Sequence, residues 1–132
     1  MVEELYEIVV LDFAEDSGKP LARALNQHHN AVHSNKPEIV LDELLERRYG
    51  VLVANPMIPA FEGGIEAFLG AVREKRSDLS VVIRCGATYL SDGGRVLRGR
   101  YAGDKNVMFV NKSSVSQIGF EIEVILGMLG DS

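Results

Sequence analysis

Apolar runs of strand length alternate along this chain with segments whose apolar residues recur at helical spacing. The short runs predict buried β-strands at residues 6–12, 31–34, 51–54, 81–85 and 107–111. Between them, apolar residues three and four positions apart predict amphipathic helices, most clearly over residues 65–72. This alternation predicts an α/β fold built on a doubly wound, five-stranded parallel sheet.

Capping and turn residues mark the ends of the expected helices. Ser17 is expected to cap the first helix, with Pro20 in its first turn. Residues 86–103 contain five glycines, and each costs about 1 kcal/mol relative to alanine inside a helix. We therefore expect a poorly formed fourth helix in that segment, either a short helix with long loops or a wholly irregular stretch. The final helix is expected to face the core with a stripe of apolar residues at positions 115, 118, 122, 125 and 129.

Polar residues follow the strands at the edge where a parallel sheet usually binds its ligands. With the strand order 2-1-3-4-5, the carboxyl ends of the first and third strands are neighbours. This order places Asp12 beside Asn55, and the ends of the fourth and fifth strands add Cys85 and Lys112. An aspartate at position 55 could accept a phosphoryl group or bind a metal, whereas the amide of Asn55 carries no anionic oxygen. We expect the candidate site at this edge.

Composition and charge narrow the functional classes. A chain of 132 residues fits a single domain, residues 1–132. The net charge of −5 gives no basis for binding nucleic acid or an anionic membrane, and the apolar runs are far too short to span a bilayer. The acidic N-terminus lacks the layout of a signal peptide, and the lone Cys85 excludes an intramolecular disulfide. We therefore expect a cytoplasmic protein.

Four short motifs stand in order along the chain: Val9–Phe13, Val53–Pro59, Cys85-Gly86 and Phe109–Lys112. Together they resemble the receiver domain of bacterial two-component response regulators, of the chemotaxis-receiver kind, over essentially the whole chain. The resemblance implies the flavodoxin-like receiver fold. It also implies that Asn55 stands at the phosphoacceptor position, Lys112 is the pocket lysine, and Cys85 and Phe109 stand at the switch positions.

Three positions that matter to the chemistry of this family are changed. Leu11 replaces the first member of the acidic pair, Asn55 replaces the acceptor aspartate, and Cys85 replaces a Thr or Ser hydroxyl. In the family, the carboxylates hold Mg²⁺ and the acceptor attacks a phosphoryl donor. Asp12 is the remnant of that acidic pocket, so we expect at most weak Mg²⁺ binding and no other cofactor. The resemblance therefore implies a degenerate pseudo-receiver without catalytic residues, which is not an enzyme.

Three functional hypotheses are open from the sequence. The first is a signalling domain that lacks the phosphoacceptor aspartate and acts through protein–protein contacts. The second is a response regulator in a phosphorelay that retains residual phosphoryl or metal chemistry through Asp12. The third is a small-molecule-binding flavodoxin-like domain, against which the acidic segment 12–16 counts because it would repel phosphate.

The last helix carries the predicted contact surface. Phe120, Val124 and Met128 lie on nearly the opposite face from its core stripe, where a helix packed on a sheet should carry polar residues. We expect a protein partner or a second copy of the chain to bind this face.

Three clusters of charged or titratable residues have simpler explanations than a site. His28, His29 and His33 have no Cys, Asp or Glu in their stretch to complete a zinc site, so packing or exposure explains them better. Glu15 and Asp16 could replace the lost acid, but a solvated loop is the simpler expectation. Exposed loop charge likewise explains the basic residues that could otherwise bind a phosphate or an acidic partner, namely Arg95, Arg98, Arg100 and Lys105.

Overall fold

The computed structural model describes residues 5–58, 61–85, 93–111 and 122–127. Within these residues, five strands form one parallel sheet: β1 Glu7–Leu11, β2 Asn30–Ser34, β3 Val51–Ala54, β4 Ser80–Cys85 and β5 Val107–Asn111. The helices are α1 Glu15–Leu25, α2 Pro37–Leu45, α3 Gly64–Lys75 and α5 Gly93–Arg100, and residues 122–127 are also helical. The strand order is β2-β1-β3-β4-β5, so the predicted fold class is confirmed.

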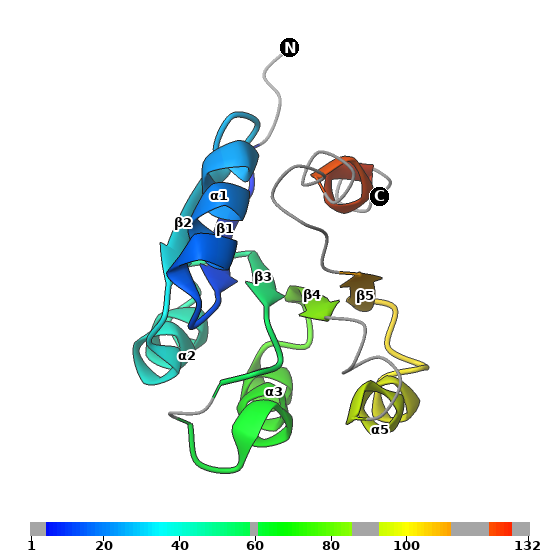
Figure 1. The fold of residues 1–132 in the computed structure, drawn as a ribbon. Helices are drawn as coiled ribbons and strands as arrows, with labels where there is room; N and C mark the ends of the chain where they lie inside the picture. The colour runs from blue at the N-terminus through cyan, green and yellow to red at the C-terminus, as the bar shows by residue number, and fades with distance from the viewer. Residues whose placement is uncertain (1–4, 59–60, 86–92, 112–121, 128–132) are drawn as a thin grey trace.

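Helices cover both faces of the sheet (Figure 1). Helix α1 and residues 122–127 lie on one face, and α2, α3 and α5 lie on the other. Successive residues of a strand point to opposite faces, so Ile8 and Val10 pack beneath α1 while Val9 and Leu11 pack against the opposite layer. Burial on both faces explains why the central strands are uninterrupted apolar runs. No helix in the described ranges has the length and apolar character that crossing a membrane requires.

The register of the strands brings polar side chains together at the carboxyl edge. Strands β1 and β3 are paired up to their last residues, so Asp12 and Asn55 leave the sheet side by side. Ala54 of β3 is paired with Ile83 of β4, so Arg84 follows at the same level on the other side of Asn55. The sheet therefore delivers an acid, an amide and a guanidinium to adjacent positions.

The start of α1 differs from the prediction. The helix begins at Glu15 instead of after a Ser17 cap, and Pro20 falls in its second turn instead of its first. The Asp12 carboxylate accepts a hydrogen bond from the Ala14 N–H at 2.9 Å, and Ala14 O accepts one from the Ser17 N–H at 3.1 Å. The chain therefore turns into the helix directly after Asp12, and the Ser17 side chain is buried.

The glycine-rich segment forms a short helix, which is one of the two forms expected for it. Helix α5 has eight residues and is shorter than α1, α2 and α3. The Leu97 side chain is fully buried in the core, and burying a leucine contributes about 1.5–3 kcal/mol, which offsets the cost of the glycines. Arg98 and Arg100 lie on this helix and not in a loop as expected. Residues 86–92 of the same segment lie outside the described residues.

The buried side chain of Arg76 forms hydrogen bonds with the end of α2 and with the segment between α2 and β3, at the amino edge of the sheet. Arg76 follows α3, and its Nη1 donates to the carbonyl oxygens of Leu44 and Tyr49 at 2.8 and 3.0 Å. Its Nε and Nη2 donate to the two carboxylate oxygens of Asp78 at 3.1 and 3.0 Å. These hydrogen bonds from Arg76 hold the pKa of the Asp78 carboxyl below its ordinary value of 3.8.

Replacing Asp78 with Asn tests the hydrogen bonds between Arg76 and Asp78. Because the Asp78 side chain is half-exposed, we expect the free energy of unfolding at neutral pH to fall by only about 1 kcal/mol or less. A carboxyl whose pKa is lowered in the folded state stabilises the protein above its unfolded pKa. The difference between wild type and Asp78→Asn should therefore shrink as the pH falls below 3.8. Urea unfolding at neutral and acid pH measures it, and a difference that grew toward acid pH would contradict the assignment.

Candidate functional site

Asp12 is the buried carboxylate at the centre of the candidate site. It follows β1 and is 1% exposed. Its Oδ1 accepts hydrogen bonds from the Ala14 backbone N–H at 2.9 Å and from Asn55 Nδ2 at 3.3 Å. Its own N–H donates to Ser34 O at 3.0 Å, and its carbonyl oxygen accepts from His33 Nε2 at 2.8 Å. Asp12 is therefore held by β2, by the end of β3 and by the start of α1.

Asn55 stands at the end of β3 with both ends of its amide engaged. The residue is 9% exposed. Its Nδ2 donates to Asp12 Oδ1, and its Oδ1 accepts the Met57 backbone N–H at 2.9 Å. Because a backbone N–H only donates, the atom that faces Met57 is the amide oxygen. The oxygen therefore holds the loop after β3, and the NH₂ group faces the carboxylate.

Arg84 is a site residue that sequence reasoning missed. It stands one position before the end of β4 and is 3% exposed. Its Nη1 donates to Ser17 Oγ at 2.9 Å and to Ser17 O at 3.2 Å, and lies 3.6 Å from Asp12 Oδ2. The sequence did contain a signal for this residue. Arg84 is a charged residue inside the apolar run 81–85, and if that run is buried, the charge requires an anionic partner.

Helix α1 approaches the site so closely that only a glycine fits at position 18. A Cβ added at Gly18 would fall against the His33 ring, 2.6 Å from its Nε2, and 2.9 Å from Asp12 Cβ. Carbon atoms in favourable contact are about 3.5–4.0 Å apart. The missing side chain therefore lets α1 pack onto the end of β1, which brings Ser17 within reach of Arg84.

Opposite charges balance in the Asp12 cluster, by which we mean Asp12, Ser17, Asn55 and Arg84. Asp12 Oδ2 accepts no hydrogen bond from any described residue, and the guanidinium 3.6 Å away supplies its electrostatic compensation. Across the described ranges, no three His, Cys, Asp or Glu side chains converge as a metal site requires. The cluster therefore holds an ion pair where a magnesium site would gather several carboxylates.

The remaining predicted residues are placed only in part. Lys112, Phe120 and Met128 lie outside the described residues, and of Cys85 the structure describes the backbone at the end of β4. Val124 is 46% exposed on the helical segment 122–127. The lysine and the thiol of the predicted site therefore stay predictions, as do two members of the contact surface.

Phe109, at the predicted switch position, is half-buried in β5. It packs against the core, and the Arg98 guanidinium of α5 lies 5.2 Å from the centroid of its ring. A cation over an aromatic face contributes about 0.5–1 kcal/mol at an exposed site. Arg98 therefore has an aromatic partner within the chain.

The three histidines have separate environments. The His33 ring donates to the Asp12 carbonyl, whereas His29 Nδ1 accepts the Tyr6 N–H at 3.2 Å. His28 is exposed in the turn after α1. The three histidines therefore have different surroundings, and His29 and His33 have separate partners.

Glu15 and Asp16 lie in the first turn of α1, not in a loop as expected. Both are exposed, and Glu15 forms an ion pair with Lys19 at 3.7 Å. Acidic side chains in a first turn interact favourably with the helix dipole. They therefore favour the helix start and do not join the Asp12 cluster.

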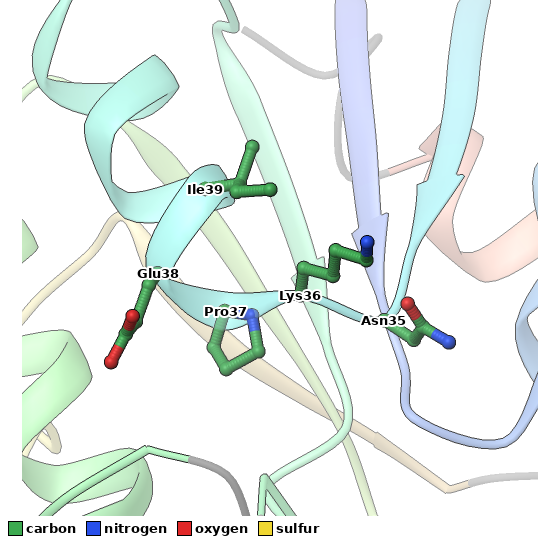
Figure 2. A pocket seen from close by; sticks show the side chains of 5 residues that line it. All are labelled: Asn35, Lys36, Pro37, Glu38 and Ile39. Atoms are coloured by element: carbon green, nitrogen blue, oxygen red, sulfur yellow. The ribbon is translucent and has the colours of Figure 1, made fainter.

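A shallow pocket of about 280 Å³ lies at the start of α2 (Figure 2). The described residues that line it are Asn35, Lys36, Pro37, Glu38 and Ile39. The Lys36 ammonium and the Glu38 carboxylate point to opposite sides of the loop. Because these charges do not converge on one point, the pocket offers no ready site for an anion or a cation.

The close approach of α1 to Asp12 is tested by Gly18→Ala. We expect the free energy of unfolding to fall by about 1–3 kcal/mol because the His33 ring must shift and lose its bond to Asp12. Gly70→Ala, in the middle of α3, is the matched control because a Cβ there meets nothing within 4 Å. The control should be neutral or stabilising by about 1 kcal/mol. Urea unfolding measures both variants, and equal effects would contradict the packing described.

Solved structures of response-regulator proteins share this fold. The response regulator DrrB of Thermotoga maritima is 21% identical with a TM-score of 0.75, over 97% of this chain and 54% of that one. This chain thus spans about half of that DrrB chain. The BeF3-activated DrrB receiver domain is 21% identical with a TM-score of 0.74, over 96% of this chain and 99% of that one. A response regulator receiver protein from Pseudomonas putida is 18% identical with a TM-score of 0.72, over 99% of this chain and 100% of that one.

These comparisons establish the fold. The sequence matches no protein-family model and no curated protein. The identities to the solved structures are low, but the matches extend over nearly the whole chain and agree with the strand order β2-β1-β3-β4-β5. The chain therefore has the flavodoxin-like fold of response-regulator receiver domains.

Proposed function

We propose that this chain is a receiver-like module of two-component signalling that is not phosphorylated at position 55 and acts in the cytoplasm through protein contacts. One observation carries the proposal. Asn55, which the resemblance places at the acceptor position, carries an amide whose oxygen accepts a hydrogen bond from the Met57 N–H. The module has no enzymatic turnover of its own in this proposal.

The chemistry of aspartyl phosphorylation supports this reading. The reaction needs a carboxylate oxygen that can attack phosphorus, together with cations that offset the charge on the transferring group. Asn55 directs its NH₂ group toward Asp12 and commits its oxygen to the backbone. A phosphoryl donor that reached this position would meet no nucleophile.

Asp12 is poorly placed to take over as the acceptor in a phosphorelay. It is 1% exposed, and its Oδ1 already accepts two hydrogen bonds. Its Oδ2 faces the guanidinium of Arg84 at 3.6 Å. The pocket at the start of α2 does not favour the small-molecule hypothesis, because its Lys36 and Glu38 charges point to opposite sides of the loop.

The last helix offers the surface for protein contacts. Ile122 and Ile125 are buried against the sheet, whereas Val124 is 46% exposed. Phe120 and Met128 were predicted on the same outer face as Val124. We propose that this face binds protein, most simply a second copy of the chain.

A phosphodonor assay tests the absence of phosphorylation. The protein is incubated with Mg²⁺ and acetyl phosphate, or with beryllofluoride, and followed by intact mass and by amide NMR shifts at positions 12 and 55. We expect no mass gain and no shift, because no nucleophile is present at position 55. Addition of one phosphoryl group, or large shifts at these positions, would refute the proposal.

Restoring the acceptor is the matched comparison. Asn55→Asp supplies a nucleophile, but Leu11 and Cys85 still differ from the residues of an active receiver. We therefore expect partial phosphorylation at most, measured by the same mass assay. Stoichiometric phosphorylation of the single variant would show that position 55 alone is responsible.

Val124→Glu tests the contact surface. We expect the fold to persist, because the side chain is half-exposed, and the dissociation constant of the dimer to rise at least about tenfold because a charge enters an apolar contact. Glu123→Gln, at the exposed neighbouring position, should leave the dimer unchanged. Sedimentation velocity measures both. A wild type that stays monomeric at high concentration, or a variant with unchanged association, would eliminate this face as a self-contact.

A further inference from the structure

We infer that Arg84 is the built-in cation of this site and takes the place of the divalent metal that receivers hold. The inference rests on the proposed function, because it concerns the same site. It also assigns a role to a residue that belongs to none of the four receiver-like motifs. The role is that of a positioning residue, since Arg84 acts by holding Asp12.

Charge balance is the first argument. Asp12 and Arg84 are 1% and 3% exposed, so each would be costly to bury without an opposite charge. Their closest atoms, Asp12 Oδ2 and Arg84 Nη1, are 3.6 Å apart. No described residue donates a hydrogen bond to that oxygen. The Arg84 guanidinium therefore compensates the charge at Asp12 Oδ2, the carboxylate oxygen that accepts no hydrogen bond from a described residue.

Coordination is the second argument. Mg²⁺ requires an octahedral set of oxygen ligands at about 2.0–2.1 Å. In the Asp12 cluster, Asp12 Oδ1 accepts two N–H groups and Asn55 Oδ1 accepts the Met57 N–H. The Asn55 NH₂ group directs its hydrogens toward Asp12, which places partial positive charge where a metal would lie. The donor set of the described residues therefore does not fit Mg²⁺.

Attachment of the guanidinium is the third argument. Arg84 donates to both Oγ and the backbone oxygen of Ser17, at 2.9 and 3.2 Å. These bonds fix the guanidinium between β4 and α1. A metal ion would therefore have to displace the Arg84 guanidinium, which two hydrogen bonds to Ser17 hold in place. The ends of β1 and β4 and the start of α1 are thus joined without an added ion.

The decisive experiment measures Mg²⁺ affinity in a background that can bind it. Asn55→Asp places a second carboxylate beside Asp12, and position 84 is then varied. We expect weak binding when Arg84 is kept and binding at least about tenfold tighter in Asn55→Asp/Arg84→Met, because the competing positive charge is gone. Asn55→Asp/Arg84→Lys is the matched control, since it retains a charge, and it should stay weak. Calorimetric titration with MgCl₂ provides the readout.

A second measurement covers the case in which Arg84→Met folds poorly. In the wild type, the midpoint of thermal unfolding should not change between metal-free buffer and excess MgCl₂, since a ligand that binds only the folded state must raise it. Unfolding of Arg84→Met, Asp12→Asn and the double variant should also show coupling, with the double variant less destabilised than the sum of the single ones. Additive effects would overturn the pairing.

The outcomes separate this inference from the proposed function. The role of Arg84 would be overturned if Mg²⁺ bound equally well with Arg, Lys or Met at position 84. It would also be overturned if Mg²⁺ raised the unfolding midpoint of the wild type but not that of Asp12→Asn. Neither result would by itself introduce a phosphoacceptor at position 55. Conversely, phosphorylation of the wild-type chain would overturn the proposed function whatever cation stabilises Asp12.

Discussion

The rest of the site depends on the burial of one carboxylate, that of Asp12, at the carboxyl edge of a parallel sheet. Burying an anion is expensive unless hydrogen bonds and an opposite charge replace the lost water. Here the loop into α1 supplies an N–H, the end of β3 supplies an amide, and β4 supplies a guanidinium. The conformation of each of these segments is therefore linked to the same negative charge.

The substitutions at this edge are mutually consistent. Leu11 belongs to the hydrophobic core on the face of α2 and α3, so the residue directly before Asp12 contributes to packing and not to the polar cluster. Asn55 is neutral and lies beside Asp12, and the Arg84 guanidinium lies 3.6 Å from the Asp12 carboxylate. A receiver with several carboxylates needs a metal to hold them together, whereas this cluster is neutral by itself. In the proposed function, this preassembled cluster takes the place of phosphorylation and metal binding.

The fold was accessible from sequence because its signals are local. Apolar runs such as 51–54 and the helical spacing over 65–72 depend on near neighbours, and they predicted β3 and α3 correctly. The predicted cap at Ser17 was wrong because a distant interaction prevails over a local one. The Ser17 hydroxyl is used by Arg84, which lies 67 residues further along the chain. Similarly, the burial of Leu97 favours the short helix α5, although three of its eight residues are glycines.

The sequence by itself determined the alternation of strands and helices and the chemical character of Asp12 and Asn55. Periodicity and residue type are sufficient for these, because they depend on near neighbours and because an amide cannot act as a carboxylate. The strand order β2-β1-β3-β4-β5, which places the two residues side by side, is fixed by the pairing of strands in the folded chain. The tertiary structure alone decided that Arg84 turns inward, that Gly18 lets α1 approach, and that the oxygen of Asn55 holds the following loop. Those features arise from contacts between segments far apart in the chain, and the energy of a buried charge depends on the partners that folding brings to it.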